Sequence, residues 1–132
     1  MPTRRQRAAT GAALTVLVLV LAGCDKIKSK QEIKKGNEFF KAANYEAALA
    51  SYQEALKLDP GEKKIYKNIG LAYMGLYQPG SKHPKDLEYA QKAIDALKKY
   101  MDAYPDDPKA PERVRTEYIT SLIKAITAGR ES

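Results

Sequence analysis

The stretch GNEFFKAANYEAALASYQEALKLDP, residues 36–60, decides the fold of this protein. Asn44 is a favoured helix N-cap residue, so it separates a first helix that ends near Ala43 from a second helix that runs from Tyr45 to about Leu58. Asp59-Pro60-Gly61 then stops the second helix, because proline and glycine interrupt regular helical structure. The stretch therefore predicts a helical hairpin.

Working outward, capping and breaking residues predict three further helices and no strands. Ser29-Lys30-Gln31-Glu32 fits a capping box, in which the serine and glutamate side chains bond to backbone amides, so we expect the first helix to begin there. A third helix is expected from about Glu62 to Tyr77 and a fourth from about Lys85 to Ala103, because residues 78–84 hold prolines and a glycine. Residues 106–132 carry an apolar stripe and predict a fifth helix.

The two hairpins share a pattern of residues. Gly36, Phe39, Ala48, Tyr52 and Pro60 recur in the second hairpin as Gly70, Tyr73, Ala93, Leu97 and Pro105. This pattern resembles the tetratricopeptide repeat (TPR), in which a helical hairpin recurs with a fixed signature. The resemblance covers residues 29–105, with an insertion near residues 78–85. It implies an all-α fold of two TPR-like helical hairpins, an α-solenoid fragment, with residues 106–132 as a C-terminal capping helix.

The repeated residue types have a physical role in such a hairpin. Gly36 and Gly70 allow the paired helix to come close, where a side chain would hold the two helices apart. Ala48 and Ala93 do the same from the second helix of each hairpin. The proline at the end of each copy stops that second helix. Larger side chains fill the remaining space, namely Phe39, Tyr52, Tyr73 and Leu97.

The resemblance also implies where a partner binds, because repeats of this family present a concave groove. Asn37 and Asn68 occupy the places of two asparagines in the carboxylate-clamp subfamily, which grips the C-terminal end of a polypeptide, but Ile33 replaces the first lysine of that clamp. The alternative is a generic groove with basic and apolar spots. For Phe40 and Met74, burial in the core is an equal alternative. The groove positions are Lys30, Ile33, Asn37, Phe40, Lys41, Lys64, Lys67, Asn68, Leu71 and Met74.

The N-terminus has the layout of an export signal. Three arginines lie between residues 4 and 7, and the apolar stretch Ala12–Leu21 has the length of a signal-peptide core, too short to span a bilayer as a helix. Leu21, Ala22, Gly23 and Cys24 then resemble the lipobox of bacterial lipoproteins. This implies that residues 1–23 are a signal peptide, that Cys24 becomes the lipidated first residue and that residues 24–28 form a short tether. A simple signal peptide with a chance cysteine is the alternative.

The positive charge of the protein is concentrated near this N-terminus. The formal net charge is +7, but three of the 23 basic residues and none of the 16 acidic ones lie before Cys24, so the remainder carries only +4. That balance requires no nucleic-acid partner. After the cysteine, nearby lysines either touch anionic lipid headgroups or belong to a solvated helix start, and both interpretations stay open. These lysines are Lys26, Lys28, Lys30, Lys34 and Lys35.

The sequence does not indicate an enzyme active site. The sequence has one histidine, His83, and one cysteine, so it lacks the ligand cluster of a metal site and a partner for a serine nucleophile. We expect no cofactor apart from the covalent lipid on Cys24, and no catalytic residues.

The resemblances together predict a lipid-anchored protein of the bacterial cell envelope, on the inner or outer membrane, with its domain outside the cytoplasm and most simply in the periplasm. Its partner would be another envelope protein or a peptide segment, bound in the role of an adaptor or assembly factor. One alternative is a subunit or pilotin-like chaperone of an outer-membrane, pilus or secretion complex. Another is a cell-wall or lipid ligand-binding protein. A homodimer is also compatible, because two repeats are small for a free-standing stack.

Overall fold

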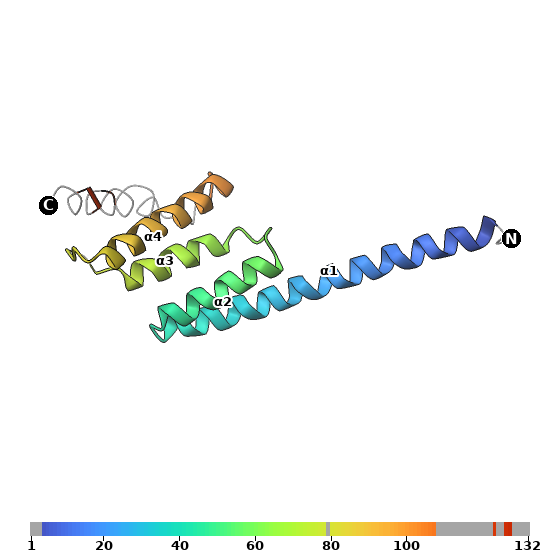
Figure 1. Cartoon of the computed structure of the whole chain (residues 1–132), viewed down its shortest axis with the longest axis horizontal. Helices are drawn as coiled ribbons and strands as arrows, with labels where there is room; N and C mark the ends of the chain where they lie inside the picture. The colour runs from blue at the N-terminus through green and yellow to red at the C-terminus, as the bar shows by residue number, and fades with distance from the viewer. Residues whose placement is uncertain (1–3, 79, 108–122, 124–125, 128–132) are drawn as a thin grey trace.

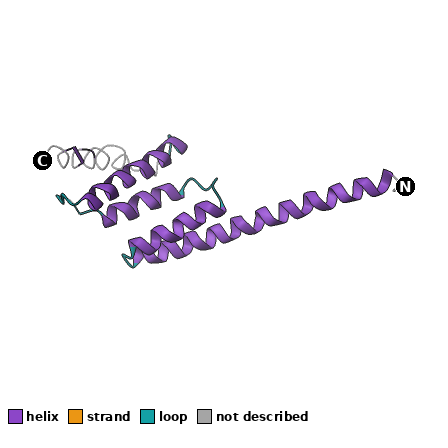
Figure 2. Cartoon of the chain, in the orientation of Figure 1, coloured by secondary structure: helices purple, strands orange, loops and turns teal. Residues whose placement is uncertain are grey.

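The computed structural model describes the backbone of residues 4–78, 80–107, 123, 126 and 127, and within these ranges the side chains from Gly23 onward. The elements are α1 (Arg4–Lys41), α2 (Tyr45–Leu58), α3 (Ile65–Leu76) and α4 (Pro84–Ala103). Figure 1 shows them as two antiparallel hairpins, with the N-terminal part of α1 extending beyond the other helices. The described residues contain helices and loops and no strand (Figure 2). The all-α, TPR-like fold is therefore confirmed.

Extensive packing runs between helices that are consecutive in the sequence. α1 packs on α2, α3 packs on α4, and α2 joins the two hairpins through α3. The main core lies between the hairpins and includes Ala48, Tyr52, Ile65 and Ala72, all at most 2% exposed. This neighbour-to-neighbour arrangement is that of a helical repeat stack.

The second helix has the bounds that the sequence predicts. α2 begins at Tyr45 and ends at Leu58, and the side-chain oxygen of Asn44 accepts a hydrogen bond from the backbone N–H of Ala47 at 3.3 Å. At the other end, the carboxylate of Asp59 accepts from the backbone N–H of Gly61 at 3.1 Å. The Asn44 side chain thus caps the start of α2, and the Asp59 side chain stabilises the turn that follows its end.

The close approach of the paired helices at two glycines is also confirmed. A Cβ atom at Gly36 would lie 2.5 Å from Cε1 of Tyr52, and one at Gly70 would lie 2.6 Å from Cγ of Leu97. Both distances are far below van der Waals contact, so only glycine fits without movement of the side chain opposite. Gly75 is a third such position, which the repeat pattern did not predict, since a Cβ atom there would lie 2.6 Å from Cζ of Tyr45.

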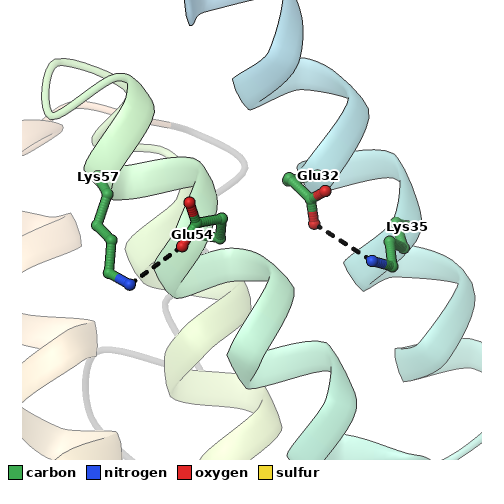
Figure 3. Close-up of polar contacts among 4 residues, drawn as sticks. All are labelled: Glu32, Lys35, Glu54 and Lys57. Atoms are coloured by element: carbon green, nitrogen blue, oxygen red, sulfur yellow. Dashed lines mark hydrogen bonds and ion pairs between the residues drawn. The ribbon is translucent and has the colours of Figure 1, made fainter.

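The predicted start of the first helix was wrong. α1 is continuous from Arg4, and Ser29 lies inside it rather than at an N-cap, so residues 24–28 are helical and not an irregular tether. The Ser29 side chain is 2% exposed, and its hydroxyl donates to the backbone oxygen of Ala55 in α2 at 2.9 Å. Glu32 forms an ion pair with Lys35 at 3.8 Å instead of closing a capping box (Figure 3). Among the residues described, no helix has the length and apolarity needed to cross a membrane.

The insertion in the second repeat mostly lengthens a helix. Ala48 lies three residues after the first residue of α2, whereas Ala93 lies nine residues after Pro84, the first residue of α4. The rest of the insertion lies in the loop between α3 and α4, which is longer than the loop between α1 and α2. His83 is exposed in this loop and is the N-cap of α4, because its Nδ1 atom accepts a hydrogen bond from the backbone N–H of Lys85 at 3.2 Å.

The expected capping helix at residues 106–132 lies almost entirely outside the described residues. Ile126 is an exception. It is 8% exposed and belongs to a cluster with Ala90, Ala93 and Ile94 of α4. An apolar residue of this segment therefore covers part of the second hairpin, as a terminal cap would.

Candidate functional site

Two neighbouring hollows lie along α1 and α3 and share Asn68; we call their combined lining the α1–α3 groove. The first has a volume of about 360 Å³ and the second about 200 Å³. The first is lined by Ile33, Glu62, Lys64, Ile65, Lys67, Asn68 and Tyr100. The second is lined by Asn37, Phe40, Lys41, Tyr52, Asn68 and Leu71.

Most of the predicted groove positions meet in this one place. Eight of the ten line one or both hollows. Lys30 is exposed on α1 and lines neither. Met74 packs against the cluster of Ala90, Ala93 and Ile94, so core packing describes it better. Phe40 lines the second hollow and also packs on the main core, where its ring meets that of Tyr45 edge-on at 5.3 Å.

The two asparagines are joined at the point where the hollows meet. Nδ2 of Asn68 donates to Oδ1 of Asn37 at 3.2 Å, and the hydroxyl of Tyr52 donates to the same oxygen at 2.8 Å. Burial of Tyr52 raises the pKa of its phenol above the ordinary value. Because both lone pairs of Asn37 Oδ1 are used inside the protein, its Nδ2 hydrogens are what this residue offers to a ligand.

Tyr100 forms the far wall of the first hollow. The Lys67 ammonium lies 5.8 Å from the centre of the Tyr100 ring, within the range of a cation–π contact. The hydroxyl of Tyr100 donates to the carboxylate of Asp107, and this hydrogen bond, together with burial, raises the pKa of Tyr100 to about 12. Tyr100 therefore ties the groove wall to the segment that follows α4.

Part of the lining was not predicted, because the repeat positions carried over from the family lie on first helices only. Tyr52 comes from α2 and Tyr100 from the end of α4. Glu62 lies in the loop before α3, and Ile65 is the first residue of α3. The sequence held one indication that Tyr100 has a role at the end of α4. It lies one helical turn before Tyr104 and five residues before Pro105, where the apolar face of α4 ends.

The charges at the groove are mostly positive. Lys41, Lys64 and Lys67 line it, and Glu62 is the single carboxylate among the described lining residues. Lys41 and Lys64 are exposed, so their ammonium groups are free to approach a ligand. With two asparagine amides and the apolar side chains of Ile33 and Leu71 between them, these lysines suit a peptide segment that carries negative charge.

The remaining predicted residues lie elsewhere. Cys24 is an exposed free cysteine on α1, and the predicted repeat-ending residues Pro60 and Pro105 lie in exposed turns after α2 and α4. Gly23 is exposed, whereas the side chains of Leu21 and Ala22 fall outside those described. Within the described ranges, no group of three or more histidine, cysteine, aspartate or glutamate side chains is placed to hold a metal ion.

An all-α stack of two hairpins with a groove along its first helices defines a helical-repeat protein of the interaction-module class. Residues 36–76, from the second half of α1 through α3, match the family model of the TPR repeat, so this protein contains a TPR repeat. No solved structure gives a significant match.

Several curated proteins are similar to part of this chain. Serine/threonine-protein phosphatase 5 of Mus musculus is 37% identical over 79 residues, which are 59% of this chain, and 15% of the phosphatase. Hsp70-Hsp90 organizing protein 2 of Arabidopsis thaliana is 32% identical over 74 residues, 56% of this chain, and 12% of that protein. Human mitochondrial import receptor subunit TOM70 is 34% identical over 85 residues, 61% of this chain, and 13% of that protein. The match thus spans less than a fifth of the length of each of these three relatives.

Proposed function

We propose that this protein is a membrane-anchored lipoprotein of the bacterial cell envelope whose α1–α3 groove docks a segment of another protein. The observation that carries the docking role is the groove itself: predicted binding positions from α1 and α3 line adjoining hollows, three of them lysines. The match to the TPR family model supports this role, because such stacks bind partners on their concave face. The protein would act as an adaptor or assembly factor.

The anchor part of the proposal rests on the N-terminal sequence and on the position of Cys24. The cysteine follows Leu21-Ala22-Gly23 directly and is exposed on α1, so its sulfur is accessible for acylation. Several acyl chains hold a protein durably at a bilayer, whereas a single one binds only marginally. The folded domain would then stand outside the cytoplasm, on the periplasmic side of the membrane that carries it.

Site-specific cross-linking in the host cells tests the docking role. A photo-reactive amino acid replaces Lys41 or Lys64 in the groove, and matched variants carry it at Lys57 or Lys98, which are exposed on α2 and α4. We expect one dominant envelope protein to be captured from both groove positions and from neither control position. Capture of the same proteins from all four positions, or of a second copy of this protein alone, would contradict a groove-directed adaptor.

The same cells test the anchor separately. Mass spectrometry of the mature protein should find an acylated N-terminal Cys24, and Cys24→Ala should release the protein from the membrane fraction. A mature protein that begins elsewhere, or an unmodified Cys24 in membrane-bound protein, would exclude the lipoprotein assignment without bearing on the groove.

A further inference from the structure

The exposed side of α1 between residues 24 and 35 is a basic surface with one apolar residue at its centre. Ile27 is 61% exposed, and lysines before and after it are exposed as well. This segment holds five lysines against two carboxylates, those of Asp25 and Glu32. Apart from Ile33, its residues do not line the α1–α3 groove, and the docking role proposed above does not account for its exposed side.

Because α1 is continuous here, the lysines and the carboxylates lie on different sides of the helix. At roughly 100° per residue, Ile27 lies about opposite Gly36 and Ser29, the two residues that face α2. All five lysines fall within about 100° of Ile27 around the helix, whereas Asp25 and Glu32 lie about 140–160° away, toward the α2 side. We call the exposed side the basic face; it consists of Ile27 with Lys26, Lys28, Lys30, Lys34 and Lys35.

Cys24 belongs to the same side, about 60° from Ile27. It is exposed like the lysines around it. Further along the helix, Glu38 is the next residue close to the direction of Ile27, and it ends the run of uninterrupted positive charge. The basic face is thus confined to the part of α1 next to the position expected to carry the lipid.

From this arrangement we propose that the basic face of α1 lies against an anionic membrane surface, with Ile27 in the headgroup region and the lysines among the phosphates. Lysine side chains place their carbon stems along apolar surface and their ammonium groups at the polar boundary. Clusters of four or more basic residues beside a membrane attract anionic lipids. This contact adds to the proposed lipid anchor and does not require it.

The contact fixes how the groove faces the membrane. On α1, the groove residues Ile33 and Asn37 lie about 80–120° from Ile27 around the helix. With Ile27 toward the bilayer, the groove therefore opens sideways, along the membrane surface. A bound segment would run close to the headgroups rather than away from them.

The test uses the full-length protein with Cys24→Ser, which removes the only cysteine and any lipid on it. A polarity-sensitive fluorophore is attached at Gln31→Cys, about 40° from Ile27, or at Gln53→Cys on α2 as the matched control; both glutamines are exposed. The probe is phosphatidylcholine vesicles with and without phosphatidylglycerol. We expect the emission of the fluorophore at residue 31 to shift to the blue only on the anionic vesicles, and that at residue 53 not to shift.

Charge reversal gives the second measurement. Lys26→Glu/Lys30→Glu/Lys34→Glu should lower partitioning to the anionic vesicles by at least about tenfold, while Lys63→Glu/Lys82→Glu/Lys98→Glu, with the same change in net charge at other exposed sites, should lower it far less. Residues 1–23, which include Arg4, Arg5 and Arg7, are identical in both triple variants, so binding through them does not account for a difference between the two. An equal shift on neutral vesicles, an equal shift at residue 53, or a response that survives the first triple substitution would overturn the proposal. None of these results depends on Cys24 acylation or on groove cross-linking.

Discussion

The hydroxyl of Tyr52 donates a hydrogen bond to Oδ1 of Asn37 at 2.8 Å, and this contact joins the core to the groove. The Tyr52 side chain is 1% exposed and packs where Gly36 leaves room for its ring. Asn37, which follows Gly36 in α1, lines the second hollow. Tyr52, which packs α2 against α1, therefore also orients the side-chain amide of Asn37 in the groove.

Tyr52→Phe tests this link. The substitution removes one of the two donors to Asn37 and should lower the free energy of unfolding by about 1 kcal/mol, the usual contribution of such a hydrogen bond. Urea denaturation followed by circular dichroism measures the loss. The segment captured by the groove should bind more weakly to this variant, because Asn37 is held by Asn68 alone. Unchanged stability and affinity would mean that the hydrogen bond has no part in either.

Gly36→Ala should destabilise the protein by about 1–3 kcal/mol, because the new methyl group overlaps the Tyr52 ring. Alanine is otherwise the better helix former, so a loss of stability here identifies a steric effect. In the full-length chain with residues 1–23 retained, Gly23→Ala, on the same helix with nothing within 4 Å of the added Cβ, is the matched control and should not lose stability. Equal behaviour of the two variants would argue against the close helix contact.

Substitutions of Ser29 distinguish a serine at a helix N-cap from a serine buried against α2. Ser29→Ala should cost about 1 kcal/mol through the lost bond to Ala55. Ser29→Asp would keep a good N-cap if the helix began there, but it should cost roughly 2 kcal/mol or more if the side chain is buried against α2. Thermal unfolding of the two variants decides the matter, and a stable Ser29→Asp protein would favour the capping box.

These cases show what local sequence can and cannot predict here. The cap at Asn44 and the stop at Asp59 act within a few residues, so the bounds of α2 could be predicted directly. The glycine positions were predictable because a repeated pattern identified their partner residues. The bond from Ser29 to Ala55 spans 26 residues, and a serine followed by a glutamate three positions later has the same local sequence whether it is a cap or a buried contact. Tyr100 reaches the groove from the end of α4, and its spacing from Tyr104 and Pro105 marks the end of that helix without indicating the contact.

Alkaline pH should destabilise the protein through Tyr100. Its pKa is about 12 in the folded protein and about 10 when unfolded, so the folded state holds the proton more tightly. The stabilisation of the folded state by the protonated Tyr100 side chain is fully present below about pH 10 and is lost as the pH rises toward 12. Urea denaturation across this pH range measures the fall in the free energy of unfolding. Tyr100→Phe should show a smaller fall, whereas Tyr104→Phe, which keeps the bond to Asp107, should behave like the unsubstituted protein.

Charge reversal in the groove should weaken docking without unfolding the protein. Lys41→Glu/Lys64→Glu changes two exposed groove residues, and binding of the captured segment should fall by about tenfold or more if that segment is acidic. Lys57→Glu/Lys98→Glu is the control with the same net charge. Isothermal titration at low and high salt measures both. An affinity unaffected by the groove substitutions would show that the segment binds through another surface.

The described helices of this protein pack mainly on their neighbours in sequence, and extensive contacts do not join α1 to α4. Cooperativity in such a stack passes from each unit to the next, so the α2–α3 interface is where it can be interrupted. That interface includes Gly75 against Tyr45. A bulky residue at position 75 would therefore weaken the coupling between the hairpins, and we expect the two to unfold in more separate steps.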